Sequence, residues 1–188
     1  MKIAECVLVS STPYSQRTYY EGPKLPKESD KDFEARTWKE HCHVDKDGYI
    51  FIPPMAFANV IKEAARYLSL PIQGKGKQTY TKHFESGVLV PEPLRLSVTK
   101  DTVEGEWVFV PSDGKRGGGR RVLKCFIFIR EWKGKVVFYI LDDIITEDIF
   151  RQVLKTAGDL IGIGRFRPSH WGYYGRFKAE KVTWVAQE

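Results

Sequence analysis

Residues 162–177 are GIGRFRPSHWGYYGRF, and this stretch decides the fold that the sequence predicts. Its sixteen residues include four glycines, three arginines and five aromatic residues. Glycine lets a backbone come close to a ligand, arginine binds phosphate through paired hydrogen bonds, and aromatic faces stack on bases. This composition is typical of a loop that faces single-stranded nucleic acid.

The alternative interpretation of this stretch is structural, because glycine often ends a helix and aromatic side chains often pack in a core. We favour the nucleic-acid interpretation, since arginines are costly to bury without partners and should reach the surface. The residues predicted to contact the strand are Gly162, Gly164, Arg165, Phe166, Arg167, Trp171, Tyr173, Tyr174 and Arg176.

The residues before this stretch predict an amphipathic helix. Thr146 is a favourable N-cap, and Glu147 and Asp148 suit the positive end of the helix dipole. Apolar residues then recur at the spacing of one helix face: Ile149, Phe150, Val153, Leu154, Ala157, Leu160 and Ile161.

The stretch is followed by a predicted last strand at 177–185, with Val182 and Trp184 on one face. Near the N-terminus, residues 3–9 are apolar and β-branched, which predicts a first strand. Residues 54–70 predict a first long helix, which begins at one proline and ends before the next. Its apolar stripe consists of Phe57, Val60, Ile61, Ala64, Ala65 and Leu68.

The middle of the chain predicts two pairs of strands. Residues 94–98 and 106–110 are expected to pair, and residues 122–129 and 135–141 are expected to form a hairpin that turns at 132–134. Elsewhere, residues 32–43 predict a short helix, residues 49–52 a short strand and residues 72–93 a loop.

The main elements follow the order strand, helix, hairpin, helix, strand. This is the βαββαβ order of an α+β, ferredoxin-like sheet of the RNA-recognition type. We expect residues 1–188 to form a single domain, with two long insertions at about 10–52 and 70–121.

Three segments carry a resemblance to a known family. Residues 161–164 and 172–177 alternate glycine with apolar or aromatic residues, and residues 51–66 enter a helix through an apolar-proline segment and end in Ala-Ala-Arg. In these features the chain resembles the RAMP superfamily of CRISPR effector subunits, and most of all the backbone subunits. The resemblance implies a glycine-rich loop that contacts the strand, RNA rather than single-stranded DNA, homo-oligomers or filaments along that strand, and other effector subunits as partners.

Two further basic segments are candidates for the strand path, although a charged loop is often only solvated. Their glycines are flexible enough to follow a phosphate backbone. Each cation that neutralises a phosphate there would make binding more dependent on salt concentration. The candidate residues are Lys75, Lys77, Lys82, His83, Lys115, Arg116, Arg120 and Arg121.

The overall composition agrees with an anionic partner. Thirty Lys and Arg residues against 24 Asp and Glu give a formal charge of +6 and a pI of about 9.1. The odd number of cysteines (Cys6, Cys42 and Cys125) favours a reducing compartment, with Cys6 and Cys125 buried. The sequence has neither a signal-peptide core nor an apolar run that could span a bilayer, so we expect a cytoplasmic protein without membrane contact.

The sequence offers little for catalysis, and we expect no enzymatic activity, no cofactor and no metal. Residues 41–43 are His-Cys-His, but adjacent side chains rarely bind one ion together. Asp142 and Asp143 suit a turn. Four aspartates after the first strand are the candidates if the protein cuts RNA, as some RAMP backbone subunits do: Asp30, Asp32, Asp45 and Asp47.

The sequence therefore leads first to a non-enzymatic protein that binds single-stranded nucleic acid. The second hypothesis is a phage or plasmid interaction protein that engages or blocks a CRISPR complex. The third is a metal-dependent ribonuclease.

Overall fold

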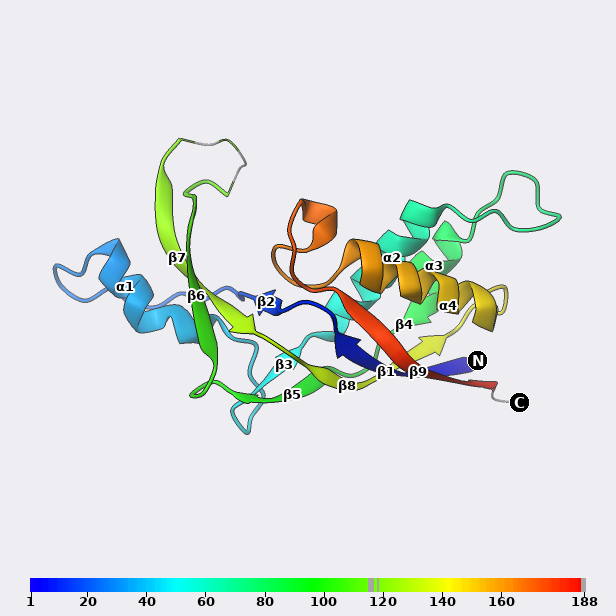
Figure 1. Cartoon of the computed structure of the whole chain (residues 1–188), viewed down its shortest axis with the longest axis horizontal. Helices are drawn as coiled ribbons and strands as arrows, with labels where there is room; N and C mark the ends of the chain where they lie inside the picture. Colours follow the sequence, from blue (N-terminus) through cyan, green and yellow to red (C-terminus); the bar gives the residue numbers. More distant parts are fainter. Residues whose placement is uncertain (115–116, 118, 187–188) are drawn as a thin grey trace.

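The computed structural model describes residues 1–114, 117 and 119–186. Its central element is an antiparallel sheet of four strands in the order β4-β8-β1-β9. The bounds of these strands are β1 Lys2–Ser10, β4 Val88–Leu89, β8 Lys133–Ile140 and β9 Phe177–Ala186. Helices α2 (Pro54–Leu68) and α4 (Glu147–Thr156) lie on one side of this sheet (Figure 1).

The core between the helices and the sheet comes from alternate residues of each strand. Ala4, Cys6 and Leu8 of β1 are fully buried, because every second side chain of a strand points to the same face. Helix α2 buries Phe57, Val60, Ile61, Ala64 and Ala65, which are five of the six residues predicted for its apolar stripe.

Helix α4 begins as the sequence predicts, because the Thr146 side chain accepts a hydrogen bond from the amide of Ile149. Its end differs from the prediction. Ala157–Ile161 form a π-helical turn, labelled η2, in which the Gly162 amide donates to the Ala157 carbonyl. The wider turn shifts the helical register, so Leu160 is 49% exposed although the stripe predicted it to be buried.

The last strand confirms its predicted pattern. Val182 and Trp184 are partly buried, whereas Lys181, Thr183 and Val185 are exposed. The ring of Trp184 packs against that of Phe150 in α4, at 5.6 Å between centroids.

A second part of the structure lies to one end of the four-stranded sheet (Figure 1). It contains a three-stranded sheet in the order β2-β7-β6, formed by β2 Tyr14–Gln16, β6 Glu104–Pro111 and β7 Arg121–Ile129. Helix α1 (Asp30–Thr37) and the 3-10 helix η1 (Trp38–His41) pack on β7. Strands β3 (Tyr49–Ile52) and β5 (Leu94–Thr99) pair separately.

Both predicted strand pairings in the middle of the chain are wrong. Strand β5 pairs with β3 rather than with β6, and β6 forms a hairpin with β7. Strands β7 and β8 belong to different sheets. Between them the Trp132 amide donates to the Ser10 side chain, and the Ser10 amide donates to the Trp132 carbonyl, so the chain passes along β1 instead of turning back.

The loop predicted at 72–93 contains two short elements that the sequence pattern did not indicate. Helix α3 (Thr81–Gly87) leads directly into β4, which pairs with β8. These elements have seven and two residues, too few for a periodic apolar pattern to show.

The three cysteines are buried and free, as expected for Cys6 and Cys125. Burial raises the pKa of Cys6 to about 12 and that of Cys42 to about 11, so both thiols stay protonated near neutral pH. Among the described residues, no helix is long and apolar enough to cross a bilayer.

Candidate nucleic-acid interface

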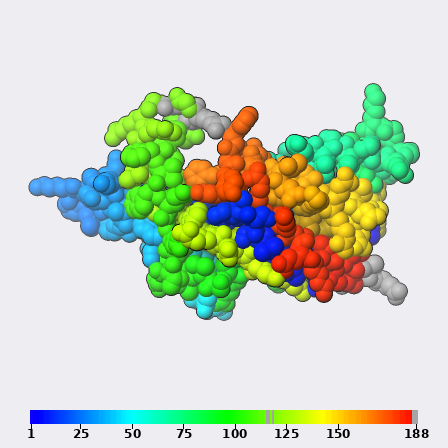
Figure 2. All heavy atoms as spheres, viewed as in Figure 1, coloured from blue at the N-terminus to red at the C-terminus, as the bar shows by residue number. Residues whose placement is uncertain are grey.

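The glycine-rich segment, residues 162–176, lies between α2 and the β6-β7 hairpin and projects from the surface beside it (Figures 1 and 2). Two backbone contacts tie it to the chain that follows β1: the Arg165 amide donates to the Ser15 carbonyl, and the Gly175 amide donates to the Pro13 carbonyl. The segment is therefore held in place by the protein itself.

Two of the glycines are required by close packing within the protein. A Cβ atom on Gly175 would lie 1.9 Å from the Ile163 carbonyl oxygen, and one on Gly164 would lie 2.3 Å from the Ser15 carbonyl oxygen. Both residues also have positive φ angles, +80° and +76°, which side chains disfavour. These glycines let the segment pack on itself and on β2 rather than leaving space for a ligand.

The three arginines of the segment have different surroundings. Arg167 lies 3.6 Å from a carboxylate oxygen of Glu63 in α2. Arg176 donates from Nε to the Asp159 carbonyl and from Nη1 to the Tyr173 carbonyl, so it also holds the segment together. Arg165 is exposed as a residue, but its guanidinium lies over the ring of Phe126 in β7, at 5.1 Å from the centroid, and partial burial there lowers its pKa.

The aromatic residues fall into two groups. The rings of Phe166 and Tyr174 pack against Phe126 and Phe128 of the hairpin, at 4.9 and 5.5 Å between centroids. Tyr173 is 63% exposed and Trp171 is 83% exposed. The second group presents most of its aromatic surface to solvent, whereas Phe166 and Tyr174 are half-buried and use part of their rings for packing within the protein.

A groove runs between α2 and the segment, with a cavity volume of about 900 Å³. Helix α2 contributes one face to it, including Lys62, Arg66 and the exposed Tyr67, because residues three to four apart share a helix face. The 3-10 turn η3 (Pro168–His170) and Arg167 form the opposite wall. The exposed Leu160 also lines the groove.

The charge of this groove is positive. Its lining includes the cations Lys62, Arg66 and Arg167, against one carboxylate, Glu63. Arg66 forms an ion pair with Glu85 of α3 at 2.6 Å, in which the Arg66 side chain is 66% exposed and the Glu85 side chain is 37% exposed. Such a pair contributes little to stability in water, so its arginine can exchange to a phosphate.

The other predicted basic residues lie away from this groove. Lys82 and His83 are on α3, where His83 Nδ1 lies 2.6 Å from Asp142, and the His83 hydrogen bond lowers the pKa of Asp142. Lys75 and Lys77 are in the exposed loop between α2 and α3.

Arg120 and Arg121 line a separate groove between α1 and the hairpin, together with Lys24, Lys31 and Lys124. Lys115 and Arg116 fall outside the described residues.

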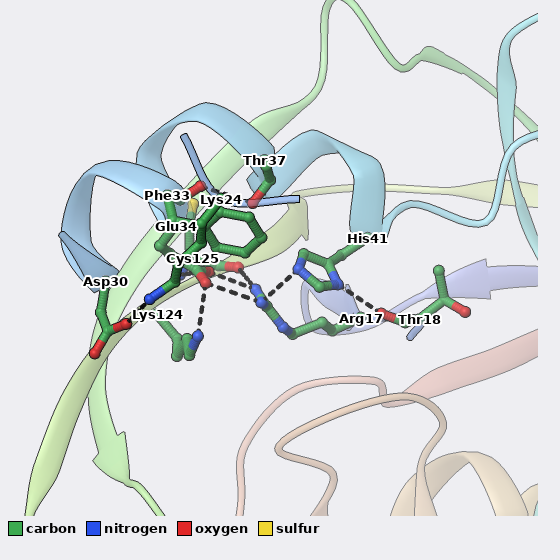
Figure 3. Close-up of polar contacts among 10 residues, drawn as sticks. All are labelled: Arg17, Thr18, Lys24, Asp30, Phe33, Glu34, Thr37, His41, Lys124 and Cys125. Atoms are coloured by element: carbon green, nitrogen blue, oxygen red, sulfur yellow. Dashed lines mark hydrogen bonds and ion pairs between the residues drawn. The ribbon is translucent and has the colours of Figure 1, made fainter. Parts of the chain in front are cut away.

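A buried ionic cluster joins α1 to β7 (Figure 3). Arg17 binds Glu34 through two hydrogen bonds of 2.7 and 3.0 Å, and its Nη1 also donates to the Cys125 carbonyl. Glu34 further accepts from Lys124 and from the Cys125 amide, each at 2.9 Å. Strand β2 pairs with β7 only as far as Ile127. At Cys125 the side chains of Arg17 and Glu34 therefore bind the backbone groups that a neighbouring strand would otherwise bind.

His41 completes this cluster as a neutral ring. Its Nδ1 lies 2.7 Å from the Thr18 carbonyl, which can only accept, so Nδ1 carries the proton and Nε2 accepts from Arg17 at 2.6 Å. Burial is the main cause that lowers the pKa of His41. The second histidine of the His-Cys-His sequence, His43, lies against the ring of Phe51, at 5.7 Å between centroids.

The carboxylates considered for catalysis all have partners. Asp45 and Asp47 both bind Arg95, at 3.0 and 3.2 Å, and Asp30 binds Lys24. Asp32 accepts from the hydroxyl of Ser29, which caps α1. Among the described residues, no group of three or more His, Cys, Asp or Glu side chains is placed to hold a metal ion.

Sequence reasoning missed Lys62, Arg66, Arg17 and Glu34. Lys62 and Arg66 were visible as the polar face of the first long helix, but only the fold shows that this face meets the glycine-rich segment. Arg17 and Glu34 lie in a polar, irregular part of the sequence and become buried only when α1 docks on β7.

No protein-family model matches this chain. No curated protein matches it in sequence. Two solved structures are similar to it. In the cryo-EM structure of the type III-B Cmr-beta bound to cognate target RNA, one chain matches with a TM-score of 0.55 and 13% identity. The match covers 98% of the present chain and 60% of that chain.

The crystal structure of Cmr6 from Pyrococcus furiosus matches with a TM-score of 0.46 and 13% identity, over 95% of this chain and 99% of that one. The present chain thus spans about 60% of the length of the Cmr-beta chain, and it shares fold rather than sequence with it. The mixed α+β structure with antiparallel sheets agrees with this likeness. The chain therefore has a fold similar to that of a chain of the type III-B Cmr-beta complex, which agrees with the RAMP resemblance that the sequence indicated.

Proposed function

We propose that this protein binds single-stranded RNA, with the phosphate backbone in the groove between α2 and the glycine-rich segment. The observation that carries the proposal is the gathering of Lys62, Arg66 and Arg167 around one open groove. Cations that neutralise phosphates release counterions, and this release drives sequence-independent binding. Exposed Tyr173 and Trp171 in the same segment offer faces for stacking bases.

The fold supports this assignment in two ways. The strand order β4-β8-β1-β9, with α2 after β1 and α4 after β8, is the arrangement expected of a ferredoxin-like core. The Cmr-beta structure, which has a similar fold, is bound to target RNA. By analogy we favour RNA over single-stranded DNA, and we propose that copies of the chain or other effector subunits line up along the strand.

We propose no catalytic step for the chain. The aspartates of the candidate ribonuclease loop are engaged by Arg95, Lys24 and the cap of α1, which leaves no unpaired acidic cluster there. RNA bound in the presence of Mg²⁺ should therefore stay intact.

The groove is tested by the double variant Lys62→Ala/Arg66→Ala. We expect its affinity for a labelled 12-nucleotide RNA to fall at least about tenfold, because two charged contacts to phosphate are lost. The slope of log K against log salt should become shallower by about 1.4, since each phosphate contact on a single strand contributes about 0.7. Fluorescence anisotropy at several salt concentrations measures both quantities.

The matched control is Lys46→Ala/Lys181→Ala, which removes the same charge at two exposed positions outside the groove. It should bind RNA with nearly the wild-type salt slope. Equal losses in the two variants would show that only net charge matters and would contradict the groove assignment.

A further inference from the structure

A second, smaller pocket lies on the other side of the glycine-rich segment, against strand β6. Its cavity volume is about 320 Å³, and it is lined by Glu106, Val108, Phe166, Tyr173 and Tyr174. This volume is at the lower end of the range for pockets that hold small ligands, about 300–1,000 Å³. The lining has three aromatic rings, one aliphatic side chain and a single charged group.

The pocket and the backbone groove are joined by one turn of the chain. Phe166 lines the pocket and its neighbour Arg167 lines the groove. Phe166 has a φ of +55°, and its carbonyl accepts a hydrogen bond from the Tyr174 amide. The turn is therefore fixed, with the Phe166 side chain in the pocket and the Arg167 side chain in the groove. A strand that crosses this turn would therefore contact both the groove and the pocket.

The position of Glu106 is the informative feature. Its Oε1 accepts a hydrogen bond from the Tyr174 hydroxyl at 2.9 Å, which orients the carboxylate. Among the described residues, no hydrogen bond or ion pair reaches the second oxygen, Oε2. A carboxylate repels phosphate, so its presence beside a phosphate-binding groove favours a contact to a base rather than to the backbone.

The surroundings also argue against a cationic ligand such as an arginine from a partner protein. The guanidinium of Arg176 lies over the ring of Tyr173, at 5.8 Å from the centroid. Arg165 and Arg17 lie over Phe126, whose ring packs on Phe166. Arg17 is paired with Glu34, so the charges of Arg165 and Arg176 are the ones that would repel a cation and attract a nucleotide.

We propose that this pocket holds one unstacked nucleobase and that Glu106 selects a base with an exocyclic amino group, such as cytosine or adenine. An amino group donates a hydrogen bond to a carboxylate, and cytosine N4 is the standard partner of Glu in base recognition. In uracil the only ring donor is flanked by two carbonyl oxygens, which the carboxylate repels. Tyr173 supplies the exposed face for stacking. This inference rests on the proposed RNA binding.

The test compares homopolymers on the full chain. Unlabelled oligo(C), oligo(A) and oligo(U) of equal length compete for a labelled RNA at one salt concentration. We expect oligo(C) and oligo(A) to bind about 5-fold or more tightly than oligo(U), the lower end of the range for a good side chain–base pair. Glu106→Gln should reduce this ratio to below about 2 without weakening oligo(U), because the amide both donates and accepts and carries no charge.

Tyr173→Ala tests stacking separately from selection. It should weaken all three homopolymers about 5-fold or more, with an unchanged salt slope, whereas Tyr173→Phe should bind as the wild type does. Thermal unfolding of each variant shows whether the fold is kept.

The outcomes of these experiments distinguish a failure of the proposed RNA binding from a failure of the proposed base pocket. If the wild-type protein binds none of the homopolymers, the proposed function is wrong. If it binds all three equally, or if Glu106→Gln keeps the wild-type ratio, RNA binding stands and the base pocket is wrong.

Discussion

At the scale of single residues, His41 shows how a buried polar group ties stability to pH. The ring accepts a hydrogen bond from Arg17, and a protonated ring would lose this bond and place two positive charges together. Burial, followed by the Arg17 charge, lowers the pKa of His41. The hydrogen bond to the Thr18 carbonyl and the charge of Glu34 oppose this shift without reversing it.

The sign of the effect follows from linkage. A folded-state pKa below the unfolded value of about 6.5 means that the unfolded chain binds the proton first as pH falls. The stability that neutral His41 provides is therefore complete above about pH 6.5 and is lost as pH falls through the folded-state pKa. We expect the urea midpoint to decrease between pH 7.5 and 5.5. His41→Gln should reduce that decrease but not abolish it, because burial also lowers the pKa of His43. A variant with the full wild-type pH dependence would contradict this role.

At the scale of elements, the contact between the π-helical turn and the last strand depends on Gly158. A Cβ atom there would lie 2.1 Å from the Phe177 carbonyl oxygen, and backbone cannot move as a flexible side chain can. We expect Gly158→Ala to destabilise the protein by about 1–3 kcal/mol, the usual cost of overpacking. Urea denaturation measures the change. Gly119→Ala is the control, since no atom lies within 4 Å of its added Cβ, and a similar loss in both variants would exclude the packing explanation.

The elements that the sequence predicted correctly are those with a local signal. Helices α2 and α4 have apolar stripes and recognisable starts, and β1 and β9 have clear strand patterns. Strand pairing has no such signal. Strand β7 has the apolar run of a hairpin partner for β8. Contacts made only in the fold direct the chain into another sheet, among them the hydrogen bonds between Trp132 and Ser10 and the packing of Trp132 on Phe57 and Phe177.

The same distinction applies to the candidate site. The composition of residues 162–176 located the segment, yet its glycines and two of its aromatic rings serve packing within the protein. The groove and the pocket combine this segment with α2 and β6, which are distant in sequence. Composition can indicate a binding segment, but the surfaces that it forms depend on tertiary contacts.

At the scale of the whole molecule, the net charge of +6 connects binding to assembly. Copies of a basic chain repel each other in solution, and an RNA strand that neutralises them removes this repulsion. We therefore expect assembly to need the strand. Light scattering after size exclusion should show a small species alone or with a 12-nucleotide RNA, and larger particles with a strand several times longer. High salt should dissociate these particles, and Lys62→Ala/Arg66→Ala should assemble poorly. Large particles that persist without nucleic acid and in high salt would show that protein contacts, not the strand, drive assembly.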